Sequence, residues 1–372
     1  MPAIAVALVC CAGLFPVYGQ YQPDRADTTG KRQAEMLIQK SVKELNIPGL
    51  SVSVISKGVT VYQKDFGFQN LELKVPPGPQ STYLIASVTK TFTAMAALML
   101  WEEGRLGLDD PVGKYLPALP EHWKPVTVRQ LLNHTSGIPT NLETPNQFCS
   151  FTYDPEQYTQ QNVIQETACL PLAFVPGSRF EYSGRNYFIA GLLIEKIAGM
   201  PYGDFLRERI FKPLGMEQTG MIRYRPIIPE RVNGYDFENG VFTNSPPLNP
   251  VIEFSDGGLL STIEDLKKWM LALRADRLVK PSTLQMMWTK ATLNDGSPSL
   301  YGFGFGLTPF KDQRRVGHTG GIPGFSSCVN YFPDLDLIVI LLSNTHHKDY
   351  NVGRLCNQIA AAYFPDAAPA GQ

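Results

Sequence analysis

Near both ends of the chain, the spacing of hydrophobic and polar residues shows two patterns, one typical of helices and one typical of strands. Residues 32–46 carry apolar positions three and four apart, which predicts a helix. Residues 49–68 alternate with a period of two around Lys57-Gly58, which predicts a β-hairpin. The far end is also rich in strands. Three apolar runs there predict strands, and a last amphipathic stretch predicts a closing helix: 314–319, 325–332, 336–343 and 351–363.

Helical spacing dominates the middle of the chain. From Ser87 to Glu103 the pattern is helical, and almost every position of residues 95–101 is apolar, so we expect this helix to be buried all round. Gly104 is a suitable residue to end it. Further helices are predicted between loops rich in Pro, Gly and Asn, the last of them capped by Ser261 or Thr262: 127–133, 186–199, 203–211 and 262–274.

Strands at both ends with helices between them predict an α+β fold. We expect a mainly antiparallel sheet flanked by helices, formed by residues 20–86 together with 250–372. Residues 87–249 would form a mostly helical inserted domain, with the active site between the two parts. No internal repeat is visible.

Composition narrows the functional classes. The 372 residues include 33 Lys+Arg and 34 Asp+Glu, which gives a formal charge of −1, and 44% of the residues are hydrophobic. A substantial core is therefore expected, whereas a nucleic-acid partner is not, because no basic cluster supplies the field that a phosphate backbone requires. A small-molecule or peptide substrate is the partner that we expect, and the oligomeric state stays open.

The first nineteen residues contain an uncharged apolar run, with Val17 and Gly19 as small residues before a cleavage point. This predicts a signal peptide over residues 1–19, and hence an exported protein, periplasmic or secreted. The alternative is an uncleaved anchor, for which the run is short. No later segment is apolar enough to predict a stable membrane span.

Six cysteines leave two alternatives open. In an oxidising compartment Cys149 and Cys169 are candidates for a disulfide, since both lie in a loop-like stretch, but unpaired packed thiols are the other interpretation. There is no Cys/His spacing typical of a metal site, so we expect neither a metal nor another cofactor.

Three short motifs carry the candidate chemistry. Ser87 and Lys90 lie three apart on the predicted helix, so the Lys90 ammonium can reach the Ser87 hydroxyl. The second motif is Tyr182-Ser183-Gly184 and the third is His318-Thr319-Gly320, which comes directly before two apolar strands. Each motif alone is weak, because a single Tyr is usually a packed aromatic residue and a single His near glycines is usually a turn residue.

Together, in this order and at these separations, the three motifs resemble those of the serine β-lactamase and penicillin-binding-protein family. The resemblance is greatest to class C β-lactamases, D-alanyl-D-alanine carboxypeptidases and family VIII esterases. It covers about residues 35–363 and includes three longer stretches: TVRQLLNHTSGIP (127–139), the run from Tyr182 to PLGM (213–216), and DGGLLSTIEDLKKWM (256–270). It implies the β-lactamase/transpeptidase-like version of the α+β fold.

The resemblance implies a role for each matched position. Ser87 would be the acylated nucleophile, Lys90 its partner in proton transfer and Tyr182 the relay to the leaving group, while His318 stands where relatives have Lys or His. The backbone N–H groups of Ser87 and Gly321 would form the oxyanion hole. Thr319 and Gly320, as well as Gly184 and Asn186 of the second motif, are the candidate substrate-binding residues.

Either Lys90 or Tyr182 could act as the general base, and the sequence does not choose. Both groups titrate near pH ~10, so a base at neutral pH needs a pKa lowered by about three units. For Lys90 we expect burial and a neighbouring cation to lower it together.

Two departures from the family pattern affect substrate choice. Relatives carry Asn where this chain has Gly184, and that side chain helps to bind the substrate amide and to hold the lysine. Asn186 is the nearest substitute. His318 in place of Lys weakens attraction for a substrate carboxylate, because His is mostly neutral at pH 7.

These features favour an exported serine hydrolase that forms an acyl-enzyme on Ser87 and acts on esters or amides. A D-alanyl-D-alanine carboxypeptidase, a weak class C-like β-lactamase and a non-turnover binding module of the same fold are the alternatives. Other residues are weaker candidates: His134 is expected to stabilise a turn rather than serve as a triad base, and His346-His347 are expected to lie in a loop.

Overall fold

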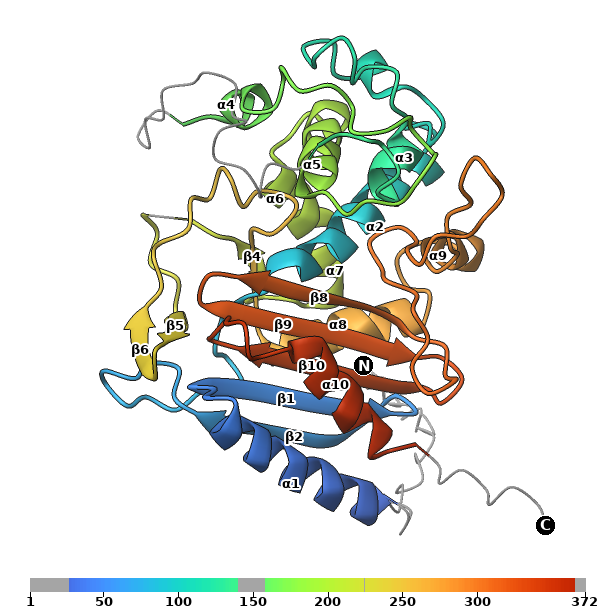
Figure 1. Cartoon of the computed structure of the whole chain (residues 1–372). Coiled ribbons are helices and arrows are strands. Elements are labelled where there is room, and N and C mark those ends of the chain that lie inside the picture. Colours follow the sequence, from blue (N-terminus) through green and yellow to red (C-terminus); the bar gives the residue numbers. More distant parts are fainter. Residues whose placement is uncertain (1–26, 140–157, 224, 365–372) are drawn as a thin grey trace, which may run out of the picture.

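The computed structural model describes residues 27–139, 158–223 and 225–364. A five-stranded antiparallel sheet in the order β2-β1-β10-β9-β8 forms its centre (Figure 1). Its strands are β1 (Gly49–Ser56), β2 (Val59–Gly67), β8 (Val316–Ile322), β9 (Phe325–Phe332) and β10 (Leu337–Ser343). The α+β fold class is confirmed, and strands from both ends of the chain lie in this one sheet.

Helices cover both faces of this sheet. On one face lie α1 (Asp27–Glu44) and α10 (Val352–Ala361), which pack on apolar side chains of β1 and β10. The other face is covered by α2 (Thr89–Glu102) and α8 (Ile263–Arg274), whose apolar side chains share one hydrophobic cluster with Ile338 and Ile340 of β10.

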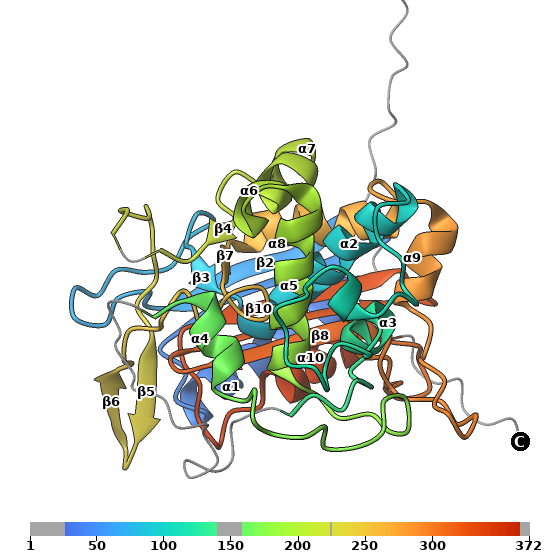
Figure 2. The same ribbon diagram turned by 90° about the horizontal axis from the view of Figure 1, so that it is seen from above.

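Most of the remaining helices come from the middle of the chain and gather above the edge strand β8 in Figure 1, on the side that faces the viewer in Figure 2. The remaining helices are the α-helices α3 (Val128–Leu132), α4 (Gln160–Gln165), α5 (Gly184–Ala198), α6 (Tyr202–Leu206), α7 (Lys212–Leu214) and α9 (Pro281–Met287), with 3₁₀ turns η1 (Ala86–Val88) and η2 (Val112–Lys114) and the π-helical turn η4 (Arg207–Phe211). The short strands form two small sheets: β3 (Tyr83–Leu84), β7 (Leu259–Ser261) and β4 (Gly220–Met221) in one, β5 (Tyr235–Glu238) and β6 (Val241–Asn244) in the other.

Local sequence explains several of these boundaries. Lys57 and Gly58 both have positive φ, as the tight turn of the predicted hairpin requires. Thr127 caps α3 with a complete capping box, and the Thr262 side chain caps α8 by accepting from the Asp265 amide. The two threonine caps satisfy backbone N–H groups that the helices themselves leave unpaired.

Other boundaries differ from the sequence prediction. Strand β8 runs to Ile322 rather than ending at residue 319, because the glycine-rich stretch pairs with β9 through to the turn. The helix expected over 203–211 is broken into α6 and the π-helical turn η4. The helix expected from Ser87 begins as the 3₁₀ turn η1 before α2.

Helix α2 is the structural centre of the molecule. Its residues from Thr89 to Leu100 are all buried, as the uniform apolar pattern predicted. The Phe92 ring stacks on Trp269 of α8 with centroids 4.1 Å apart and meets Phe211 edge-on at 5.7 Å. The amino-terminal end of this helix is therefore held in a fixed place between the sheet and the other helices.

Two predictions concern residues outside those that the structure describes. The signal peptide over residues 1–19 lies there, as does Cys149. Cys169 is not a free thiol, but its predicted pairing with Cys149 stays a prediction. Among the described residues, no helix is both long and apolar enough to cross a membrane.

Candidate active site

Ser87 lies in the tight turn that leads into α2, where its side chain is partly exposed although its neighbours are buried. The preceding residue, Ala86, has a φ of +46°, a conformation that costs energy for any residue with a Cβ. Such strain persists only where the surrounding packing fixes the backbone. It orients Ser87 out of the core and toward the edge strand β8.

Gly320 explains how close β8 comes to this turn. A Cβ at Gly320 would lie 2.4 Å from the Ile85 carbonyl oxygen and 2.9 Å from the Ala86 Cβ. The Ser327 hydroxyl of β9 donates a hydrogen bond of 2.6 Å to the same Ile85 carbonyl. The missing side chain thus allows the backbone of β8 to approach the turn that carries Ser87, and the exposed backbone of Gly321 follows directly.

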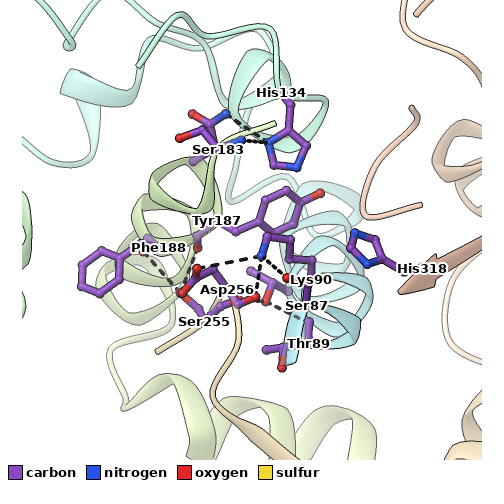
Figure 3. A network of polar contacts seen from close by, with 12 residues as sticks. Ser87, Thr89, Lys90, His134, Ser183, Tyr187, Phe188, Ser255, Asp256 and His318 are labelled. Carbon is purple, nitrogen blue, oxygen red and sulfur yellow. Dashed lines mark hydrogen bonds and ion pairs between the residues drawn. The ribbon is translucent and has the colours of Figure 1, made fainter. Parts of the chain in front are cut away.

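Lys90 has the position that the Ser-x-x-Lys spacing predicted. Its Nζ donates to Ser87 Oγ at 3.0 Å and to the backbone carbonyl of Asp256 at 2.6 Å, as Figure 3 shows. Only 1% of Lys90 is exposed, and the carboxylate oxygen Oδ2 of Asp256 lies 3.9 Å from Nζ. The lysine is therefore enclosed by acceptors and by negative charge.

These surroundings correct the expectation about the Lys90 pKa. Burial lowers the pKa, but the charges of Tyr182 and Asp256, with a smaller contribution from Glu253, outweigh it and raise the pKa above the ordinary value. Among the residues that the structure describes, no cation contributes to lowering the pKa of Lys90, contrary to the prediction. The raised pKa favours the ammonium form of Lys90, which donates to Ser87.

Tyr182 lies just before α5, with its ring facing the lysine. Lys90 Nζ is 5.1 Å from the centroid of the ring, and 38% of the residue is exposed. The ring packs on His134 with centroids 4.4 Å apart. The phenol thus lies at the open side of the cluster, where a substrate can reach it.

His134 has a structural place, as predicted. It is fully buried, and its Nδ1 accepts hydrogen bonds from the Ser183 amide at 3.3 Å and from the Asn186 amide at 3.2 Å. It thereby ties the loop after α3 to the beginning of α5 and supports the Tyr182 ring.

His318 reaches the site from β8, but both of its ring nitrogens are occupied. Nδ1 donates to the Thr319 carbonyl oxygen at 2.6 Å, and Nε2 accepts from the Tyr301 hydroxyl at 2.8 Å. Burial, with a smaller contribution from the Lys90 charge, lowers the pKa of His318 to about 3. The imidazole is neutral, so the role of a charged partner for a substrate carboxylate is excluded.

Asn186 is not a substrate-binding residue, and that prediction was wrong. It is fully buried on α5, where its side-chain oxygen accepts from the Ser136 hydroxyl at 2.6 Å while its amide faces His134. The helix turns it away from the cleft, two residues beyond Gly184. It therefore cannot stand in for the asparagine that the resemblance led us to expect at the position of Gly184.

A cavity of about 220 Å³ opens beside Tyr182 and His318. Arg315, which directly precedes β8, lines this cavity, as does Thr319, a predicted substrate-binding residue. The Arg315 side chain is held by the Thr308 carbonyl oxygen at 3.0 Å and by Asn357 at 3.4 Å. The remaining lining residues are Tyr301, Gly306, Gly317 and Asn330.

Sequence reasoning did not single out Asp256, Glu253, Tyr301 or Arg315. Asp256 lies in the stretch DGGLL, which was noted only as part of the family resemblance. Burial and repulsion by Asp256 raise the pKa of Glu253 to about 7, so the two carboxyl groups form an acidic pair beside Lys90. Within the described ranges, no cluster of three or more His, Cys, Asp or Glu could hold a metal.

Comparisons with known proteins agree with this geometry. The family model described as Beta-lactamase matches residues 34–361. Penicillin-binding protein 4* of Bacillus subtilis (strain 168) is 31% identical over 303 residues, which cover 77% of this chain and 66% of that protein. The chain belongs to the beta-lactamase family. It spans slightly less than two thirds of the length of these curated relatives, 65% and 66% in two of them.

Solved structures show the same fold. The octameric penicillin-binding protein homologue from Pyrococcus abyssi has a TM-score of 0.76 and 30% identity, covering 89% of this chain and 76% of that one. A D-stereospecific amidohydrolase from Streptomyces sp. has a TM-score of 0.75 and 29% identity, covering 93% of this chain and all (100%) of that one.

Proposed function

We propose that this chain is a serine hydrolase that forms an acyl-enzyme on Ser87 and hydrolyses ester or amide bonds. The observation that carries the proposal is the hydrogen bond from a buried ammonium, Lys90 Nζ, to the Ser87 hydroxyl oxygen at 3.0 Å. An ammonium in that place stabilises the alkoxide character that Ser87 develops as it attacks a carbonyl carbon.

Because Lys90 holds its proton, Tyr182 is the general base in this proposal. Its ring faces Lys90 Nζ and lines the cavity beside His318. As Ser87 Oγ bonds to the carbonyl carbon, its proton passes to the Tyr182 oxygen. When the bond to the leaving group breaks, Tyr182 returns that proton to the departing oxygen or nitrogen. Attack by water on the acyl-enzyme then releases the acid and restores Ser87.

The developing oxyanion would be bound by the backbone N–H groups of Ser87 and Gly321. The close approach of β8 at Gly320 supports this assignment, since it brings the strand backbone against the turn that carries Ser87. No cofactor enters the proposed reaction.

Esters and uncharged amides are the substrate class that we propose first, because His318 is neutral and cannot attract a carboxylate. Arg315 favours a second class, peptides that end in a carboxylate, since it lines the cavity beside Tyr182 and Thr319. Hydrolysis rates of p-nitrophenyl acetate, a D-alanyl-D-alanine peptide and nitrocefin would rank the ester, peptide and β-lactam activities.

Labelling with a serine-reactive phosphonate tests the proposal. The wild-type chain should gain one adduct on the peptide that contains Ser87, and Ser87→Ala should abolish it. Ser178→Ala, which changes an exposed serine elsewhere, should label like the wild type. Labelling that survives Ser87→Ala would contradict the nucleophile. An acyl burst without later turnover would instead support the binding-module alternative.

We also propose export, as predicted from residues 1–19. Expression of the full chain in a host with a secretory pathway tests it, since the mature protein should begin near residue 20. A mature product that retains residue 1 would contradict cleavage.

A further inference from the structure

Gly184 is a glycine for reasons of space rather than of backbone conformation. It is the first residue of α5, and its φ does not lie in the left-handed region that favours glycine. A Cβ built on it would lie 2.6 Å from Oδ2 of Asp256 and 3.6 Å from the Asp256 Cγ. A side chain at residue 184 would therefore require the Asp256 carboxylate to move from its present place.

The position of that carboxylate matches the end of the missing side chain. In asparagine the terminal oxygen and nitrogen lie about 2.4 Å from Cβ, given ordinary C–C and C=O bond lengths. Asp256 Oδ2 is 2.6 Å from the Cβ position of residue 184. Asp256 Oδ2 thus lies about as far from this Cβ position as the polar end of an asparagine side chain at residue 184 would lie.

Asp256 contacts the lysine at both of its ends. Its backbone carbonyl accepts the 2.6 Å hydrogen bond from Lys90 Nζ, and its Oδ2 lies 3.9 Å from the same nitrogen, as Figure 3 shows. The neighbouring Ser255 anchors the segment. Its carbonyl oxygen accepts from Thr93 of α2 at 2.6 Å, and its hydroxyl donates to the Tyr187 carbonyl of α5 at 2.9 Å.

Burial raises the pKa of Asp256, and the nearby charges of Lys90 and Arg185 offset this rise only in part. Lys90 and Arg185 both attract it, whereas Glu253 repels it. Its second oxygen, Oδ1, is buried and has no hydrogen-bond partner among the described residues. Without Lys90 and Arg185, a carboxylate in this place would be left without compensation for its lost hydration.

We propose that Asp256 is a positioning residue for Lys90 and replaces the side chain absent at Gly184. The inference rests on the proposed function, since it concerns how the ammonium is held against Ser87. It predicts that the polar group can be moved back to residue 184 when Asp256 is removed, because the two positions compete for one volume.

The test is a reciprocal exchange, followed by the rate of phosphonate labelling at Ser87. Asp256→Ala should slow labelling by about tenfold or more, because the Lys90 ammonium loses its anchor. Gly184→Asn alone should also slow it, because the new side chain collides with Asp256. The double variant Gly184→Asn/Asp256→Ala should label within about threefold of the wild type, which two independent effects cannot produce.

Three controls separate positioning from damage to the fold. Asp256→Asn keeps the shape and one acceptor oxygen, so it should be labelled faster than Asp256→Ala. Relative to the wild type, it should lower kcat for hydrolysis more than it raises KM. Asp109→Asn removes a remote exposed carboxylate, and Gly220→Asn adds a side chain where nothing lies within 4 Å. Both should label like the wild type.

Wild-type labelling of Asp256→Ala, or a double variant no faster than Asp256→Ala, would overturn the inference. If Asp256→Ala does not fold, Asp256→Asn with full wild-type kcat would overturn it equally. A wild-type chain that is not labelled at Ser87 would overturn the proposed function, and with it this inference.

Discussion

The Nε2 of His318 accepts a hydrogen bond from the Tyr301 hydroxyl over 2.8 Å, beside the cavity that both residues line. The bond fixes the imidazole as a neutral acceptor on that side, while Nδ1 donates to the Thr319 carbonyl. The histidine thus joins the third motif to a tyrosine from a separate loop. In this chain it is a structural link rather than a source of positive charge.

The low pKa of His318, about 3, predicts a pH-dependent stability. The unfolded histidine binds a proton below about pH 6.5, whereas the folded one stays neutral, so stability falls as pH falls from about 6.5 toward 3. The cost at pH 5 is about 2 kcal/mol, from 1.5 pH units at about 1.4 kcal/mol each. His318→Asn removes this titration, so its stability relative to the wild type should improve by about that amount between pH 8 and pH 5.

Urea unfolding at the two pH values measures this difference. If the free energies of unfolding of His318→Asn and the wild type differ by the same amount at pH 8 and at pH 5, the neutral, buried state of the imidazole is contradicted. Activity of the wild type between pH 5 and 8 should likewise show no step that His318→Asn removes.

Gly320→Ala should disrupt the approach of β8 to the nucleophile turn. The new methyl group would lie 2.4 Å from both the Ile85 carbonyl oxygen and the Ser327 hydroxyl. We expect a loss of about 1–3 kcal/mol in stability, typical of overpacking, and a loss of labelling at Ser87. Gly220→Ala is the matched control, since nothing lies within 4 Å of its Cβ position. Thermal melts and labelling rates that do not distinguish the two variants would refute this account of Gly320.

Arg315 should separate carboxylate-bearing substrates from neutral ones. Arg315→Ala should raise KM for a D-alanyl-D-alanine peptide by about tenfold or more, the effect of losing a charge-assisted hydrogen bond, and should leave p-nitrophenyl acetate hydrolysis nearly unchanged. Arg314→Ala provides the neighbouring control, since Arg314 is exposed and paired with Asp334. Equal losses on both substrates would mean that Arg315 supports the fold and does not select the substrate.

Much of this architecture could be predicted from local patterns. The hairpin at Lys57-Gly58, the buried helix α2, and the hydrogen bond between Ser87 and Lys90 each depend on residues close together in the sequence. Periodicity and helical spacing describe such relationships directly.

The unpredicted features depend on distant segments. Asp256 approaches Lys90 only because α2, α5 and the segment before β7 pack together, and Tyr301 meets His318 from a loop with no periodic pattern. The Lys90 pKa was predicted in the wrong direction for the same reason, since its neighbouring carboxylates come from the Asp256 segment. The substrate-binding role of Asn186 was predicted wrongly because the direction of its side chain depends on the rotation of helix α5 after Gly184.

In the proposed reaction an acyl group becomes covalently attached to Ser87, and Lys90 is required as the ammonium that donates a hydrogen bond to it. Rapid quenching of the chain with p-nitrophenyl acetate, followed by intact and peptide mass spectrometry, measures this directly. The account predicts one acetyl group on the peptide that contains Ser87, with accumulation slowed by about 100-fold or more in Lys90→Met. Acetylation of another residue, or equal accumulation in Lys90→Met and the wild type, would contradict it.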